Sequence, residues 1–181
     1  MKKYALVYLI KGDAEKYQRR VMHNFSNKFK VSDLNNHISP HITLKSPFES
    51  SFFQMFLLKQ RIRKLSKKIK KSNIRIKGIG NFGFNVIYLG VIFSEEAKKA
   101  RYNLIKSLEK LNWMSWREHD RYKNFHPHAT LTYCDNKKQF LKFKKYFLKF
   151  KPNFNLYFDN ITILRKNKSG NWQTYREIKL S

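Results

Sequence analysis

The sequence predicts a mixed α+β fold made of two similar lobes, and two observations support this. Segments with the pattern of a strand alternate with segments of helical period, and the chain closes on a strand–turn–strand segment. In addition, PHITL at residues 40–44 recurs as PHATL at residues 127–131, about half a chain length later. We therefore expect an internally duplicated architecture, with residues 1–181 forming a single domain of two lobes.

The first half begins with a strand at residues 4–10, where β-branched and aromatic residues dominate. A turn at Gly12 leads to a helix over residues 14–29, because its apolar residues recur every three or four positions. A short strand follows at 41–44, which Pro40 and Pro47 should limit. A second helix is expected over residues 51–71, and its second half is densely basic.

The second half starts with strands at 73–79 and 85–93, separated by a glycine-bearing turn. Ser94 is a suitable N-cap for a helix whose apolar stripe ends at Leu111. Residues 113–127 lack a clear period and predict a loop, which leads to a strand over residues 128–133. The remaining elements are a helix at 136–150 and two strands at 154–164 and 172–180, joined by a hairpin-like turn.

The composition is strongly basic. Against 12 Asp and Glu stand 39 Lys and Arg, which gives a formal net charge of +27, and 41% of the residues are hydrophobic. A polyanionic partner is one explanation, and a codon bias that favours Lys, Asn, Phe and Ile is the other. Cys134 is the only cysteine, so the chain cannot build a disulfide or a thiolate zinc site by itself, which fits a reduced, cytoplasmic location.

The two PHxTL segments carry the chemistry. In a strand, residues i and i+2 share a face, so His41 projects with Thr43, and His128 with Thr130. One neutral imidazole could take a proton from an attacking hydroxyl or water while the other, protonated, gives one to the leaving oxygen. The threonine hydroxyls could donate hydrogen bonds to the phosphoryl oxygens. The alternative for a single His-x-Thr is a structural polar pair, but two matching copies favour catalysis.

At these residues the chain resembles the two-histidine (2H) phosphoesterases, the superfamily of 2′-5′ RNA ligase-like proteins and cyclic phosphodiesterases. HITLKSPF, GNFGFNVIYLGV and FHPHATL follow the order expected for that family, over nearly the whole chain. The resemblance implies a bilobal fold with pseudo-twofold symmetry, antiparallel sheets lining a central cleft and helices outside. It also implies catalytic roles for His41, Thr43, His128 and Thr130, on a 2′,3′-cyclic phosphate or a 2′-5′ linkage.

Neither a metal nor another cofactor is expected. Glu118 and Asp120 could in principle combine with two histidines to bind a metal, but the sequence has no spacing typical of metal ligands, so we do not expect such a site. For substrate binding, Lys45 could pair with a phosphate oxygen, and aromatic residues could stack on a base. Each of these has an ordinary alternative, a solvated lysine or a core aromatic. The residues proposed to bind substrate are Lys45, Phe84, Trp116 and Tyr133.

The remaining histidines are given no catalytic role: His126 is expected at a loop surface, and His23, His37 and His119 have no partner motif. The expected partner is RNA or a nucleotide, and we expect a monomer. The rival hypothesis is a noncatalytic RNA-binding module that retains the fold. Binding to a membrane surface through the basic helix segment at residues 59–71 is disfavoured, because the segment lacks an obviously exposed aromatic face.

Overall fold

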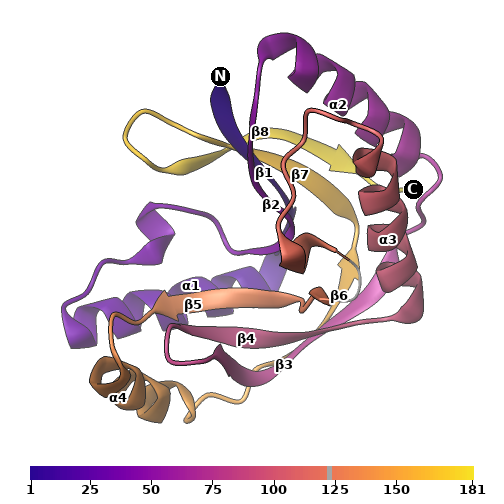
Figure 1. The fold of residues 1–181 in the computed structure, drawn as a ribbon. Coiled ribbons are helices and arrows are strands. Elements are labelled where there is room, and N and C mark those ends of the chain that lie inside the picture. Colours follow the sequence, from indigo (N-terminus) through magenta and orange to yellow (C-terminus); the bar gives the residue numbers. More distant parts are fainter. Residues whose placement is uncertain (122–123) are drawn as a thin grey trace.

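A computed structural model describes residues 1–121 and 124–181 and contains two antiparallel four-stranded sheets (Figure 1). In the first sheet the strand order is β2-β1-β7-β8, and in the second it is β5-β4-β3-β6. The strands of the first sheet are β1 (Lys2–Leu9), β2 (His41–Ser50), β7 (Asn160–Lys166) and β8 (Trp172–Lys179). Those of the second are β3 (Ser72–Phe82), β4 (Val86–Phe93), β5 (His128–Tyr133) and β6 (Asn153–Phe158).

The two sheets repeat one arrangement, which confirms the predicted α+β fold of two pseudo-symmetric halves. Helix α1 (Gly12–Phe29) joins β1 to its antiparallel neighbour β2, and α3 (Glu95–Glu109) joins β4 to its antiparallel neighbour β5 in the same way. The second strand of each unit lies at the edge of its sheet and starts with the histidine of its PHxTL segment. A further helix follows each of them, α2 (Phe52–Ser66) and α4 (Lys137–Phe147).

The helices pair outside the sheets. Helices α2 and α3 contact one another beside the first sheet, and α1 meets α4 through Phe25, whose ring lies 4.7 Å from that of Phe143 and 4.6 Å from that of Phe147 (Figure 1). One cluster of buried side chains includes residues from both sheets and all four helices. Burial of these apolar side chains is the main force that joins the layers.

The helix predicted over residues 51–71 is shorter than expected. Ser51 begins it with a capping box, in which its hydroxyl accepts from the backbone of Gln54, but regular structure ends at Ser66. The next residues pair instead with the C-terminus: Ser181 donates from its backbone to Ile69, and Lys71 donates to Ser181. Buried Ile69 therefore leaves the helix to join the core at the end of the chain.

The single strand predicted over residues 154–164 is two strands in different sheets. The strand is interrupted at Asp159: the part before it, β6, pairs with β3, and the part after it, β7, pairs with β1. Asn160 secures the crossing, because its side chain accepts from the backbone N–H of Leu9 at 3.0 Å and donates to the Leu9 carbonyl at 3.1 Å. An alternating pattern does not reveal which sheet each part of an apolar run joins. The residue that Asn160 bonds, Leu9, is 151 positions away in the sequence, so this contact could not be predicted locally.

Strand β2 is longer than the predicted residues 41–44, because it runs through Pro47 to Ser50. Proline lacks a backbone N–H, but β2 is an edge strand, where one side of the backbone needs no partner in the sheet. Pairing with β1 is also irregular here, with register shifts on both sides of Leu6. The predicted loop at 113–127 contains a short 3₁₀ helix, Glu118–Asp120, and its residues 122–123 lie outside the described residues.

Candidate active site

The two edge strands place the four motif residues in equivalent positions. His41 lies opposite Leu9 of β1, and His128 lies opposite Gly90 of β4. Strands β2 and β5 contact one another, so the motifs of the two sheets meet. The motif histidines and threonines are half-buried, whereas the intervening residues are fully buried on the opposite face, as the strand alternation predicts: Ile42, Leu44, Ala129 and Leu131.

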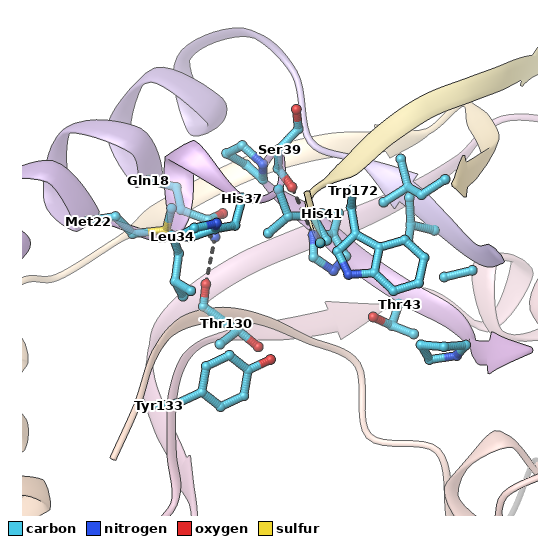
Figure 2. Close-up of a pocket in the computed structure, with 17 residues that line it drawn as sticks. Gln18, Met22, Leu34, His37, Ser39, His41, Thr43, Thr130, Tyr133 and Trp172 are labelled. Atoms are coloured by element: carbon cyan, nitrogen blue, oxygen red, sulfur yellow. Dashed lines mark hydrogen bonds between the residues drawn. The ribbon is translucent and has the colours of Figure 1, made fainter. Parts of the chain in front are cut away.

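Each of the two imidazoles is held by a hydrogen bond of the same kind, from Nδ1 to the backbone carbonyl two residues before it. Nδ1 of His41 donates to the carbonyl of Ser39 at 2.8 Å (Figure 2), and Nδ1 of His128 donates to the carbonyl of His126 at 2.8 Å. A carbonyl only accepts, so the proton of each neutral ring is assigned to Nδ1 and the lone pair to Nε2. Each ring can therefore exchange a proton at Nε2 while its orientation stays fixed.

Burial keeps both rings neutral at neutral pH. It lowers the pKa of His41 to about 4; the hydrogen bond to Ser39 opposes this shift, and the nearby charge of His128 adds to it. Burial also lowers the pKa of His128, the His126 carbonyl opposes the shift, and the charges of His126 and His119 add to it. Because protonation of His128 disfavours protonation of His41, the pair is suited to hold one proton rather than two.

Each connecting helix also holds the histidine strand of the other sheet. From α1, Gln18 donates a hydrogen bond from Nε2 to the carbonyl of Thr130 at 3.0 Å (Figure 2). From α3, Arg101 donates from Nη2 to the carbonyl of Leu44 at 3.2 Å. These reciprocal contacts fix the two edge strands relative to one another, and thereby the two imidazoles.

Two cavities flank the motif residues. The first, about 310 Å³, is lined by His41 and Thr43, and the second, about 520 Å³, by His128. Both share Thr43, Pro47 and Tyr133, so they are adjoining parts of one cleft. Apolar residues of the first sheet and the β8 indole, which stands beside His41 in Figure 2, line the first cavity: Ala5, Val7, Leu164 and Trp172.

The second cavity is lined by rings and cationic groups. The ring of Phe82 meets that of His128 edge-on at 4.8 Å, and Tyr88 lies 5.3 Å from the same imidazole. The Tyr88 hydroxyl hydrogen-bonds Nε2 of His126 at 3.0 Å. Gly80 makes room for this arrangement, because a Cβ there would lie 2.4 Å from the Tyr88 ring. Arg117 and His119 also line this cavity, so it combines stacking surfaces with groups that attract anions.

The structure corrects the expectation that Lys45 shares a face with Thr43. Val7 pairs with Thr43 but Leu6 pairs with Lys45, so Leu44 is an extra residue that reverses the side-chain alternation. The Lys45 side chain is fully buried, and its ammonium donates to the Asp120 carboxylate at 2.9 Å. Lys45 lines neither cavity, so the structure does not bring it to the cleft.

The three aromatic candidates have different positions. Tyr133 lines both cavities with 61% of its surface exposed, because a similar irregularity in the β4–β5 register turns it toward the cleft. Phe84 packs edge-on against Phe140 of α4 at 5.3 Å and lines neither cavity. Trp116 packs against the core, with the Lys45 ammonium 5.0 Å from its ring. Only Tyr133 is brought together with the motif residues.

Other cleft residues had no usable pattern in the sequence. Trp172 lies in the C-terminal hairpin, far along the chain from His41, and no motif connects them. The sequence predicts no function for His119, although its Nε2 lies 2.8 Å from the Ser46 hydroxyl and it lines the second cavity. For His126, its position two residues before His128 is the one feature of the sequence that could have placed it at the cleft. Within residues 1–121 and 124–181, no group of three or more His, Cys, Asp or Glu side chains is placed to hold a metal ion.

Comparison with known proteins agrees with this architecture. The family model of the 2′-5′ RNA ligase superfamily matches residues 14–170. No curated protein sequence matches the chain. Among solved structures, Escherichia coli LigT complexed with 3′-AMP superposes with a TM-score of 0.63 at 13% identity, covering 99% of this chain and 98% of that one.

Two further structures have the same fold. A protein described as a phosphoesterase superposes with a TM-score of 0.62 at 13% identity and covers 99% of this chain and 98% of its own. The protein TT0787 of Thermus thermophilus superposes with a TM-score of 0.61 at 14% identity and covers 98% of this chain and 97% of its own. At these identities the likeness establishes a shared fold.

Proposed function

We propose that this chain, which belongs to the 2′-5′ RNA ligase superfamily, is a metal-independent phosphoesterase acting on RNA-type phosphodiesters. Its substrate group would be a 2′,3′-cyclic phosphate or a 2′-5′ linkage. The observation that carries the proposal is the matched setting of two imidazoles, each held through Nδ1 at 2.8 Å with Nε2 left for proton exchange. A structural histidine pair would have no need of two identical arrangements.

In the proposed reaction His41 is the general base and His128 the general acid. His41 is suited to the first role because its pKa of about 4 keeps Nε2 unprotonated. With a cyclic phosphate, His41 would take a proton from a water molecule whose oxygen bonds to phosphorus. His128 would give its proton to the ribose oxygen that leaves as its bond to phosphorus breaks. The products are a phosphate monoester and a free ribose hydroxyl.

Thr43 and Thr130 would stabilise the charge that builds up on phosphorus. Both line the first cavity beside His41, and Thr43 also lines the second. Their hydroxyls can donate to the non-bridging oxygens, an interaction that strengthens as these oxygens gain negative charge. An anionic phosphate in the cleft would also raise the pKa of both histidines and so favour the protonated form of His128.

Tyr133 and the apolar first cavity are the proposed nucleoside contacts. A base has an apolar face that fits beside Trp172, and Tyr133 can reach either cavity. The 3′-AMP named for the E. coli structure suggests an adenine nucleotide as the first ligand to test. We also propose that residues 1–181 act as one domain, because one buried cluster includes side chains of both sheets.

The test is hydrolysis of nucleoside 2′,3′-cyclic phosphates and a 2′-5′-linked dinucleotide in excess EDTA. Replacing His41 or His128 with Ala should lower kcat by about 10²–10⁴-fold, the usual contribution of one general acid or base. His23→Ala is the matched control, because His23 is exposed and bonds to Asp33 outside the cleft. Full activity in His41→Ala would refute the mechanism. Nucleotide binding without turnover in the wild type would favour the noncatalytic RNA-binding alternative.

A further inference from the structure

The start of helix α2 exposes a cluster of large apolar side chains. Phe52 is 85% exposed, Phe53 67%, Phe56 45% and Leu57 37%. At helical spacing these four residues share one face, opposite the buried Met55, Leu58 and Ile62. Single exposed apolar residues are ordinary, but a contiguous group on one face indicates a contact surface. The basic segment at residues 59–71 itself contains no aromatic residue, as expected, but the same helix exposes this aromatic cluster directly before it.

The same face continues into a cationic surface. Arg63 and Lys64 follow on the outward side of α2, and four more exposed lysines come directly after it: Lys67, Lys68, Lys70 and Lys71. None of these six cations forms a salt bridge with the described part of the chain, and residues 52–71 contain no Asp or Glu. A groove between α2 and α3 is lined by further cations, Arg61 and Lys110, and by no acidic residue.

We propose that this face of α2 binds the surface of a bilayer that contains anionic phospholipids. Phe52, Phe53 and Phe56 would enter the boundary between headgroups and acyl chains, and the cations of α2 would contact lipid phosphates. A helix with aromatic residues and a cluster of four to eight Lys and Arg has the chemistry of such binding. Among the described residues, no helix is both long enough and apolar enough to cross a membrane. Helix α2 would lie along the surface.

The shape and place of the face favour lipid over the other polyanions. Phe52 and Phe53 protrude at the first turn of the helix, so they fit the fluid interior of a lipid bilayer better than a preformed pocket of a protein partner. RNA would match the cations, but it gives no reason for four adjacent exposed apolar side chains. No residue of this face lines either cavity of the cleft, so the surface is separate from the proposed active site and the inference does not depend on that function.

The test is co-sedimentation with vesicles of phosphatidylcholine, with and without phosphatidylglycerol. Wild type should bind the anionic vesicles at least about tenfold more tightly than the neutral ones. Phe52→Ser/Phe53→Ser should weaken binding by about tenfold or more, since two apolar side chains are lost from the boundary. Arg63→Gln/Lys64→Gln should weaken it by a similar factor of about ten, and added salt should reduce that difference.

The matched control is Ile92→Ser/Tyr157→Ser, which removes two side chains that are 56% and 64% exposed on strands of the second sheet. Its vesicle binding should equal that of the wild type, and thermal unfolding should show that every variant is folded. A Phe53→Trp reporter should shift its fluorescence to the blue and be quenched by brominated acyl chains only in anionic vesicles.

Four results would overturn the proposal. The first is equal binding to neutral and anionic vesicles, and the second is undiminished binding by Phe52→Ser/Phe53→Ser. The third is no vesicle binding by the wild type, together with self-association that the Phe variant abolishes, which would make the face a contact between copies of the chain. A loss of RNA affinity in the Phe variant without any loss of vesicle binding would likewise assign the face to RNA.

Discussion

Asp120 holds a buried charge cluster together, and Asp120→Asn should destabilise the protein strongly. Its carboxylate accepts from the Lys45 ammonium at 2.9 Å, from the backbone of Ser46 at 2.7 Å and from the backbone of Arg117 at 2.9 Å. Arg101 is also buried over the ring of Phe125, and its Nε and Nη1 have no hydrogen-bond partner among the described residues. Asp120 therefore supplies the negative charge for two buried cations.

The expected cost is about 3–5 kcal/mol, the usual effect of removing one partner of a buried ion pair. Asn keeps one acceptor oxygen, so one or two of the three hydrogen bonds to the carboxylate are lost, at about 1.5–3 kcal/mol each, which is consistent with a cost of this size. For a chain of this length the melting temperature should fall by about 6–20 °C, at about 2–4 °C per kcal/mol. Urea unfolding at pH 7 measures the free energy directly.

Two comparisons make the measurement specific. Glu109→Gln removes an exposed partner of Lys106 and should cost at most about 1 kcal/mol. Lys45→Met should cost less in the Asp120→Asn background than in the wild type, because the uncompensated ammonium is gone, with a coupling of about 1–3 kcal/mol. If Asp120→Asn costs no more than Glu109→Gln, the buried cluster does not stabilise the fold as argued.

The pH dependence of Asp120 follows from its bonds. Burial raises the pKa of this carboxyl, but hydrogen bonds from Lys45, Ser46 and Arg117 outweigh burial and hold the pKa below its ordinary value. The unfolded chain therefore binds the proton first as pH falls. The stabilisation should be complete above the ordinary value of 3.8 and decline as pH falls toward the lower folded pKa. Asp120→Asn should lose less stability than wild type over that range.

Other predictions concern the cleft and the sheets. In a pH series, kcat/KM should rise as His41 loses its proton, with pKa about 4, and fall above the pKa of His128, which lies below 6.5; a maximum above pH 7 would contradict this. Gly90→Ala should cost about 1–3 kcal/mol in urea unfolding, because its Cβ would lie 2.6 Å from a backbone carbonyl. Asn160→Ala should cost about 2–4 kcal/mol in the same assay, because the Leu9 backbone groups lose their partners; a loss within the error of the assay would refute that reason.

The elements that the sequence predicted correctly are those with local causes. The helix that starts after Ser94 has an N-cap whose hydroxyl accepts from Ala97, and its apolar stripe is buried as expected. The strand at residues 128–133 was predicted with the bounds it has in the structure, because its first four residues alternate between polar and apolar as a strand requires. The length of β2 depended on its position at the edge of the sheet, and the end of α2 depended on pairing with the C-terminal residue Ser181. Neither is a local property of the sequence.

The amino-acid sequence by itself determined the duplicated α+β architecture and the pairing of His41 with His128, because period and repeat are encoded locally. Only the tertiary structure decided which residues join them. One extra residue in the pairing of β2 turned Lys45 into the interior, and a similar irregularity in β5 turned Tyr133 into the cleft. Trp172 lies beside His41 because its backbone N–H donates to the carbonyl of His37, in the segment before β2, and α2 exposes its phenylalanines because its other face already meets the core. Register, strand order and burial are fixed by contacts between distant segments, so no local pattern specifies them.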